Sequence, residues 1–135
     1  MPCSFDHKFG HWVCERAGGT YSESRCVAVG RETSDGRILG GFVYDGYNGK
    51  SIRMHVAGEG NWLSEELLHM AFWYPFEQLK VTKVIGLIES TNPRCIRLAK
   101  RLGFVQEAEI KDAAPDGDWL ILTLTREQCK YLGDK

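Results

Sequence analysis

The sequence predicts an α+β fold in which a mostly antiparallel sheet is flanked by helices. Between residues 25 and 56, short apolar or alternating runs recur between clusters of turn residues, which is typical of antiparallel strands. After residue 60, two amphipathic stretches alternate with an apolar run, which indicates a strand-helix-strand unit and hence a parallel pair of strands. At 135 residues the chain is expected to form a single domain, with residues 1–24 as an N-terminal helix or loop segment and residues 25–125 as the core.

The composition is close to that of an average globular protein. Hydrophobic residues make up 43% of the chain and charged residues 26%, and the formal net charge is −1. This balance gives no electrostatic reason to expect nucleic acid or an anionic membrane as a partner. The five cysteines are scattered and odd in number, which favours reduced thiols over a disulfide framework. Residues 1–20 lack the apolar segment of a secretory signal, so we expect a cytoplasmic protein with no membrane-spanning segment.

The N-terminal segment is the least patterned part of the chain. Trp12 and Val13 are the best anchors for a short helix, which Gly18 and Gly19 would end. The spacing Cys-x3-His-x3-His-x2-Cys in the same segment could also close a zinc site. The residues concerned are Cys3, His7, His11 and Cys14. A loosely patterned segment with free thiols is the favoured interpretation, and we expect no metal.

Two strands joined by a turn are predicted next. The apolar run within residues 25–32 indicates a buried strand, and Ser34-Asp35-Gly36 supplies the turn into a second strand at residues 37–44. Two consecutive glycines, Gly40 and Gly41, lie inside that second strand. They predict a β-bulge or a close approach of another part of the chain.

A third strand and a helix follow. Apolar and polar residues alternate over residues 52–56, which places His55 on the strand face opposite the core. In the next stretch, Glu65 and Glu66 suit the first turn of a helix, and Pro75 marks its far end. Apolar residues recur there at helical spacing: Leu63, Leu67, Met70, Ala71 and Tyr74.

The next strand and helix have the strongest local signals of the chain. Residues 82–88 are largely β-branched and apolar, as expected for a strand buried on both faces. Asn92 can cap the following helix, Pro93 suits its first position, and Gly103 is a helix stop. The apolar stripe of this helix consists of Cys95, Leu98, Ala99 and Leu102.

A hairpin is predicted to close the fold. Its strands are residues 105–111 and 119–125, and its turn is Pro115-Asp116-Gly117. The strands that end near Val56 and Ile88 are joined by a helix, so they should run parallel with a right-handed crossover. The loops at their C-terminal ends should therefore lie side by side.

Two segments at that edge of the sheet carry a recognisable pattern. The first is residues 55–60, His-Val-Ala-Gly-Glu-Gly, and the second runs from Asn92 through Cys95 to Leu102-Gly103-Phe104. In this order they resemble the GNAT superfamily of acyl-CoA-dependent N-acetyltransferases, over residues 26–125. The family patterns are Gln/Arg-x-x-Gly-x-Gly/Ala and a helix that begins Asn-x-x-Ala/Ser and ends Leu-Gly-Phe. At the first position of the first pattern, this chain has His55 in place of Gln or Arg. The length and ending resemble small phage-encoded members, and the resemblance implies a parallel strand pair that splays at its C-terminal end.

The resemblance also implies acetyl-CoA as the acyl donor, bound as a cosubstrate. The strand end at Val56 and Ala57 would offer N–H groups to the acetyl carbonyl, and Asn92 would lie beside the pantetheine arm. The pyrophosphate would be held by the backbone N–H groups of Gly58, Glu59, Gly60 and Asn61. An ordinary strand-to-helix turn is the alternative for this loop, and a simple helix cap is the alternative for Asn92.

Side-chain charges near the loop do not favour a phosphate. No Lys or Arg occurs from residue 54 to residue 79, and Glu59 places a carboxylate in the loop itself. Arg94, Arg97 and Arg101 fall on one face of the next helix and could reach the phosphates. A solvated basic face explains this stripe equally well.

Direct attack of an amine on a thioester needs a deprotonated nucleophile, a polarised carbonyl and a proton for the leaving thiolate. The candidate bases are Glu89 and His55, each at the end of a strand, and His titrates near neutral pH. Where many members of the family carry a tyrosine acid, this chain has Ala99. Substitutes for that acid are Cys95, Ser90 and Thr91. Each candidate also has a structural explanation, and Cys95 could act instead as a covalent nucleophile or simply pack as a buried thiol.

We therefore expect an N-acetyltransferase that moves an acetyl group from acetyl-CoA to an amine of a protein, peptide or small molecule. The alternative is a non-catalytic CoA-binding or protein-interaction domain of the same fold. An aromatic cluster in and after the first long helix should be mostly core, and its remaining members could line an acceptor pocket or a homodimer face. Its members are Trp62, Phe72, Trp73, Tyr74 and Phe76.

Overall fold

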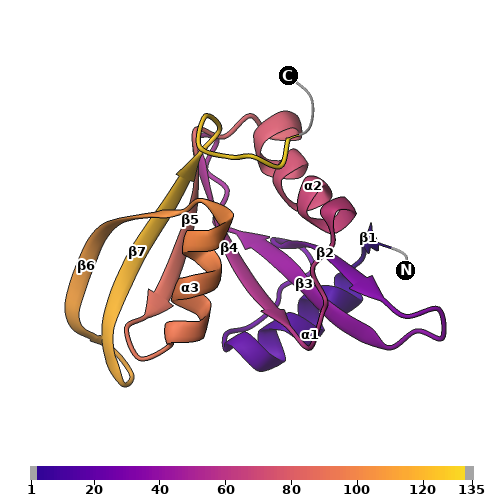
Figure 1. Cartoon of the computed structure of the whole chain (residues 1–135), viewed down its shortest axis with the longest axis horizontal. Helices are drawn as coiled ribbons and strands as arrows, with labels where there is room; N and C mark the ends of the chain where they lie inside the picture. The colour runs from indigo at the N-terminus through magenta and orange to yellow at the C-terminus, as the bar shows by residue number, and fades with distance from the viewer. Residues whose placement is uncertain (1–2, 133–135) are drawn as a thin grey trace.

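The computed structural model describes residues 3–132, which form one mixed sheet with helices on both faces (Figure 1). In chain order the elements are β1 (Cys3–Phe5), α1 (His7–Ala17), β2 (Val27–Glu32), β3 (Ile38–Asp45), β4 (Ser51–Gly58), α2 (Glu65–Trp73), the π-helical turn η1 (Tyr74–Gln78), β5 (Lys83–Glu89), α3 (Pro93–Leu102), β6 (Val105–Ala114) and β7 (Gly117–Thr125). The strand order is β1-β2-β3-β4-β5-β7-β6, and only β4 and β5 are parallel neighbours. The predicted α+β architecture is confirmed.

The parallel strands β4 and β5 separate toward their C-terminal ends. Their register contains only three residue pairs, and the last of these is Arg53 with Ile85. Beyond that pair, β4 continues to Gly58 and β5 continues to Glu89, and the two strands diverge (Figure 1). The predicted splay of the central pair is therefore confirmed, and the segments on which the site predictions fall lie on its two sides.

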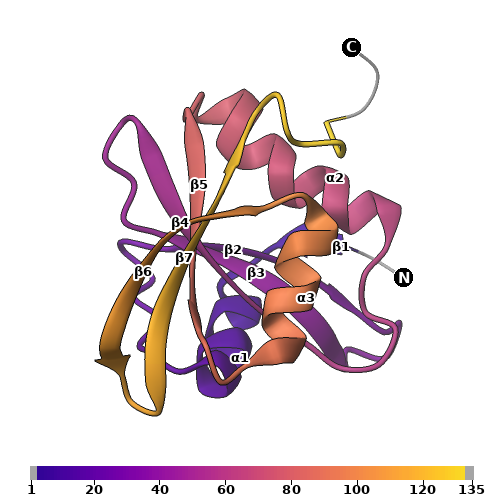
Figure 2. The same ribbon diagram turned by 60° about the vertical axis from the view of Figure 1, so that its left-hand side comes forward.

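Different helices cover the two faces of the sheet (Figure 2). α1 packs on β2, β3 and β4 around a small core that includes Phe9, Val13 and Val43. α2 and α3 contribute to the larger core on the opposite face, which includes Leu67 and Phe72. None of the helices in residues 3–132 combines the length and the apolar character that a membrane crossing requires.

The side chains of β4 alternate between the two faces of the sheet. Ile52 and Met54 are 2% and 6% exposed within the larger core, whereas Arg53 between them is exposed. His55 follows Arg53 on the α1 face because successive side chains of a strand point to opposite faces. The prediction that His55 lies opposite the core stripe of its strand is confirmed.

The paired glycines of β3 lie at a bulge, as predicted. In β2, Arg31 pairs with Gly40 and Glu32 pairs with Ile38, so Leu39 is the extra residue on β3. On the other side of β3, the regular pairing with β4 continues one residue past the strand end, because the N–H of Glu59 donates to the Leu39 carbonyl at 2.9 Å.

The N-terminal segment contains the predicted helix and one strand that was not predicted. Asp6 caps α1 by accepting a hydrogen bond from the Lys8 N–H at 2.9 Å, and Gly18 ends the helix with a positive φ of 86°. β1 precedes the helix as a short edge strand paired with β2. At three residues, β1 is too short to show a period in the sequence.

The α-helix α2 ends at Trp73 with Tyr74 as its C-cap, so the prediction that Pro75 marks its far end is confirmed. The chain continues as the π-helical turn η1, in which the N–H of Leu79 donates to the Tyr74 carbonyl at 3.0 Å. Proline lacks an N–H and its ring conflicts with the carbonyl four residues earlier in an α-helix. A wider turn at this point accommodates the ring, so the helical segment reaches Gln78.

The hydrophobic core extends beyond residue 125, the predicted end of the core segment. Cys129 and Leu132 are 4% and 8% exposed and belong to the larger core. The Tyr131 ring stacks on the Phe72 ring at a centroid distance of 5.5 Å. Residues 126–132 therefore cover α2, although they form no helix or strand that a periodic pattern could reveal.

Candidate functional site

The loop between β4 and α2 contains a row of unsatisfied backbone donors. β4 ends at Gly58 and α2 begins at Glu65, with Ser64 as a cap that accepts from the Leu67 N–H at 3.1 Å. The N–H of Glu59 donates to β3, but the N–H groups of residues 60–64 have no acceptor within the described part of the chain. Free N–H groups before the positive end of a helix are suited to binding an anion.

The two glycines of this loop have different structural roles. A Cβ at Gly58 would lie 2.2 Å from the ring atoms of Trp62, and one at Gly40 would lie 2.4 Å from the same ring. Trp62 is only 7% exposed and packs against Phe42 at a centroid distance of 5.4 Å. Gly60 has a φ of +59° with no atom within 4 Å of a Cβ, so it faces open space. Gly58 is thus required by the tryptophan, and Gly60 is the glycine open to a ligand.

Two arginines from distant parts of the chain supply cations to this loop. Arg31 on β2 donates through Nη1 to the carbonyl oxygens of Asn61 and Trp62 at 3.1 and 3.0 Å. Arg16 on α1 lies with Nε 3.5 Å from a Glu59 carboxylate oxygen. Each arginine lies 30 to 43 positions away from its partner in the loop, so neither is among the loop's neighbours in the sequence. The pairing of β2, β3 and β4 places Arg31 at the loop, and the packing of α1 on these strands places Arg16 there.

Helix α3 lies on the other side of the splay and has the predicted ends. The Asn92 side-chain oxygen accepts from the Cys95 N–H at 3.1 Å, and Gly103 ends the helix with a φ of 108°. Both helix-end predictions are confirmed. The cap role of Asn92 engages its oxygen and leaves its amide nitrogen without a partner among residues 3–132.

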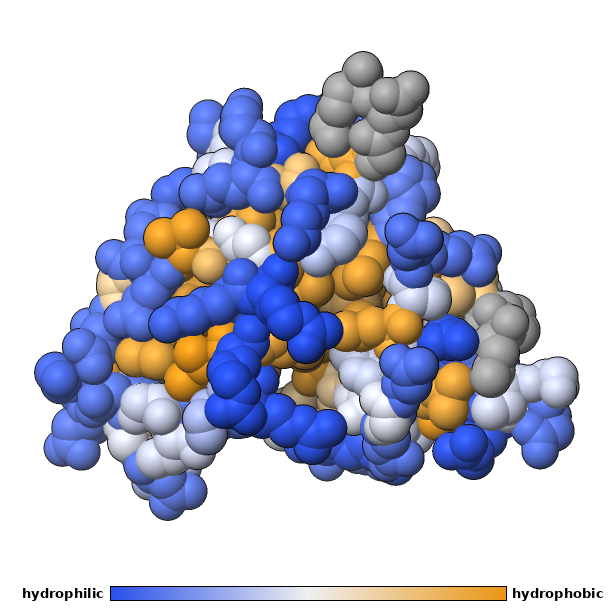
Figure 3. Space-filling view, viewed as in Figure 1, coloured by the Kyte–Doolittle hydropathy of each residue, from blue (hydrophilic) through white to orange (hydrophobic). Residues whose placement is uncertain are grey.

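The basic residues of α3 form an exposed ridge. Within residues 3–132 they make no ion pair, and all four are exposed: Arg94, Arg97, Lys100 and Arg101. In the space-filling view, a hydrophilic ridge runs over α3, and the surface beside it is hollowed down to hydrophobic side chains (Figure 3). The ridge is therefore free to meet an anionic group at the rim of this hollow.

Both candidate bases lie on the α1 face, one on each side of the splay. Arg53 and Ile85 are paired, so the residues two and four positions later, His55 and Glu89, share their face. His55 Nε2 lies 3.2 Å from a carboxylate oxygen of Asp45. The Glu89 carboxylate has no hydrogen bond or ion pair within the described residues, and its side chain is half-buried. Sequence reasoning missed Asp45, which comes from the neighbouring strand.

The candidate acids differ in their surroundings. Ala99 is 9% exposed within the larger core, so this position contributes only to packing. Burial raises the pKa of the Cys95 thiol, which therefore stays protonated at neutral pH. That state suits a proton donor and disfavours a covalent nucleophile. The Ser90 hydroxyl accepts from the Asp118 N–H at 3.0 Å and so links the end of β5 to β7.

The structure does not bring together the four residues of the alternative zinc site. Cys3 packs against the larger core on the α2 face, whereas Cys14 packs against the α1 core on the opposite face. His7 Nδ1 lies 2.7 Å from the Tyr21 hydroxyl, and His11 Nε2 lies 2.8 Å from a Glu23 carboxylate oxygen. Among residues 3–132 no group of three or more His, Cys, Asp or Glu side chains is placed to hold a metal.

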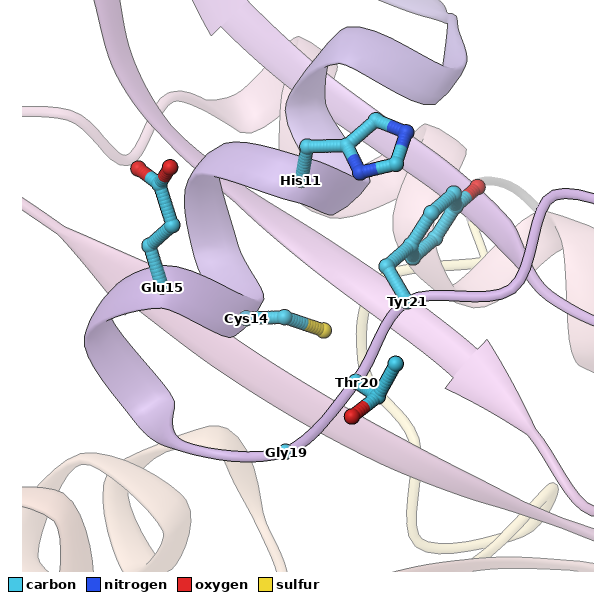
Figure 4. Close-up of a pocket in the computed structure, with 6 residues that line it drawn as sticks. All are labelled: His11, Cys14, Glu15, Gly19, Thr20 and Tyr21. Atoms are coloured by element: carbon cyan, nitrogen blue, oxygen red, sulfur yellow. The ribbon is translucent and has the colours of Figure 1, made fainter.

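A shallow recess of about 240 Å³ lies beside α1 (Figure 4). It is lined by His11, Cys14, Glu15, Gly19, Thr20 and Tyr21. Burial raises the pKa of the tyrosine to about 12, and its hydroxyl lies 2.7 Å from His7 Nδ1. None of the predicted cofactor or catalytic residues lines this recess, which is separate from the hollow beside α3.

Comparisons with known proteins agree on the fold. A variant of spermidine N-acetyltransferase SpeG from Vibrio cholerae is similar with a TM-score of 0.76 and 17% identity, over 98% of this chain and 98% of that chain. The N-acetyltransferase PseH of Campylobacter jejuni, in complex with acetyl coenzyme A, is similar with a TM-score of 0.59 and 18% identity, over 77% of this chain and 70% of that chain. No family model and no curated protein matches the sequence. At these identities the likeness establishes the fold and leaves the activity to be argued from the site.

Proposed function

We propose that this chain, which has the fold of the GNAT acetyltransferases, transfers an acetyl group from acetyl-CoA to an amine. The observation that carries the proposal is the free N–H row of residues 60–64 beside the β4–β5 splay. Solved N-acetyltransferases share this fold, and one of them was solved with acetyl coenzyme A. The specific acceptor, a homodimer and a cytoplasmic location stay predictions.

Several groups of the site can hold acetyl-CoA. The N–H groups from Gly60 onward can hold the pyrophosphate, and Arg97 and Arg101, which are exposed on α3, can meet phosphate oxygens. Beyond Arg53 the β5 side of β4 is unpaired, so the N–H of Val56 can face the acetyl carbonyl, whereas the N–H of Ala57 points toward its partner Gly41 on β3. The free amide nitrogen of Asn92 can donate to the pantetheine arm.

The chemistry needs one base and one acid. The amine nitrogen bonds to the acetyl carbon, the carbon–sulfur bond breaks, the proton of the amine passes to the base, and the thiolate takes a proton. His55 is suited to the base role because Asp45 can accept its Nε2 proton and leave Nδ1 as the acceptor. Glu89 is the second candidate, and the protonated thiol of Cys95 is the candidate acid.

We expect that replacing the true base lowers kcat by roughly 100- to 10,000-fold without changing the KM for acetyl-CoA. His55→Gln and Glu89→Gln test the two candidates separately, because each change keeps the size and removes the basic group. Asp45→Asn should reproduce part of the loss only if His55 is the base. Steady-state rates across pH would measure this, and near-normal kcat in both Gln variants would contradict both assignments.

The rival function is a non-catalytic domain that binds CoA or a partner protein. The buried Ala99 at the usual tyrosine position and the Glu59 carboxylate in the loop are the observations that favour it. To separate the two, the purified protein would be incubated with acetyl-CoA and a panel of amines. The panel would include spermidine, peptides and cell lysate proteins, with mass spectrometry as the readout. Acetylated products above the protein-free background support the enzyme, and binding without any product favours the rival.

A further inference from the structure

We infer that Arg31 is a positioning residue that holds the β4–α2 loop in the conformation that binds a pyrophosphate. The inference rests on the proposed function and adds a residue that no local sequence pattern connects with the loop. Arg31 lies on β2, on the face that carries α2, and reaches the loop across β3. Its guanidinium does not touch the predicted phosphate site and acts through the backbone.

The two hydrogen bonds of Arg31 fix the direction of two N–H groups. Nη1 donates to the carbonyl oxygens of Asn61 and Trp62, so both carbonyls point toward β2. In a trans peptide the C=O and the following N–H point in opposite directions. The N–H groups of Trp62 and Leu63 therefore both point away from Arg31, and neither has an acceptor within residues 3–132. Two consecutive N–H groups aimed the same way form a concave anion site.

Arg31 also places an uncompensated positive charge behind these donors. Within the described residues it forms no ion pair, and its Nε is buried without a hydrogen-bond partner. A partly buried charge is screened by salt less than an exposed one. Arg31 thus supplies the cation that the loop itself lacks and offsets the carboxylate of Glu59, which lies on the loop's other side against Arg16.

The ring of Trp62 keeps the loop in place when Arg31 is removed. It lies over Gly40 and Gly58 and is 7% exposed, so the loop remains attached to the core through this side chain. Loss of the guanidinium then releases the two carbonyls without unfolding the segment. Its expected effect is a loss of phosphate affinity, not a loss of the fold.

The test compares acetyl-CoA with S-acetylpantetheine, which lacks the pyrophosphate. Arg31→Met should raise the KM and Kd for acetyl-CoA about 10- to 100-fold, as expected for lost hydrogen bonds to a charged donor. The kcat and the kinetics with S-acetylpantetheine should stay within a few-fold of wild type. Arg31→Lys keeps the charge but not the planar fork, so it should lose less affinity than the Met variant. Arg37→Met, which changes an exposed arginine of the β2–β3 turn, is the matched control.

Other outcomes would contradict either the positioning role of Arg31 or the proposed function. Equal losses with both acetyl donors, or a large fall in the unfolding midpoint of the Lys variant, would show a general structural role and overturn the inference. Unchanged acetyl-CoA affinity in both Arg31 variants would also overturn it while leaving the proposed function intact. Failure of the wild-type protein to bind acetyl-CoA would instead contradict the proposed function, and the inference would fall with it.

Discussion

Replacing Gly60 with Glu is expected to weaken acetyl-CoA binding by about 100-fold or more relative to Gly60→Gln. The position faces open space, so either side chain fits without displacing a neighbour. Both variants carry the same backbone strain at a φ of +59°, about 1–2 kcal/mol, and this strain cancels in the comparison. They differ only in a negative charge placed beside the bound pyrophosphate, where like charges a few ångströms apart repel strongly. Calorimetric titration of both variants measures the difference.

Gly60→Asn is the control for the backbone conformation, because Asn tolerates a positive φ better than most residues. We expect it to bind acetyl-CoA within a few-fold of wild type. The Glu and Gln variants should also unfold at similar temperatures. If these two variants bind acetyl-CoA equally well, the loop at Gly60 is not the anion site.

Replacing Gly58 with Ala is expected to damage both stability and cofactor binding. The new Cβ would lie 2.2 Å from the Trp62 ring, so the ring must leave its place over β3 and β4. Overpacking of this kind costs about 1–3 kcal/mol of unfolding free energy. The loop carbonyls held by Arg31 would move with the ring, so acetyl-CoA affinity should fall together with stability.

A double-mutant cycle tests this explanation. Trp62→Leu removes the ring that a Cβ at Gly58 would strike, so the two changes together should be less harmful than the sum of their separate effects. Residues in contact typically show a coupling of about 0.5–3 kcal/mol, measurable by urea unfolding. Gly86→Ala is the matched control, since its Cβ would have ordinary contacts at 3.8 and 3.9 Å. Additive effects of the Gly58 and Trp62 changes would show that the two residues do not conflict.

Helix α3 shows which parts of the fold can be predicted from sequence. Asn92, Pro93 and Gly103 each act within one turn of a helix end, through the cap, the first position and the stop. These effects depend on the local backbone and are therefore visible in the sequence. The alternation of β4 is equally local, and it placed His55 on the correct face.

Two of the elements that were missed depend on distant contacts. β1 is too short to show a period, and the segment of Cys129 and Leu132 is held by packing on α2 without regular structure of its own. The π-helical turn depends on how the chain accommodates Pro75. The π-helical turn is a local effect of the proline, whereas tertiary packing decides the other two conformations, and a single sequence does not contain that information.

The candidate site likewise combines segments that the sequence reveals with residues that only the structure brings to it. Its glycine loop and its helix cap lie in two short segments that the sequence singles out. Arg31, Arg16 and Asp45 join the site only through the order and register of the strands and the packing of α1. The different roles of the two glycines are not visible in the sequence. Only the position of the Trp62 ring shows that Gly58 packs against this ring and that Gly60 is open.

The central claim is that the β4–α2 loop and the β4–β5 splay bind acetyl-CoA. Calorimetric titration of acetyl-CoA into the purified wild-type protein tests it most directly, with S-acetylpantetheine titrated in parallel. We expect saturable heat with acetyl-CoA and markedly weaker binding of S-acetylpantetheine, because the loop donors would have no pyrophosphate to hold. No heat at millimolar acetyl-CoA, or equal affinity for the two compounds, would contradict this account of the site.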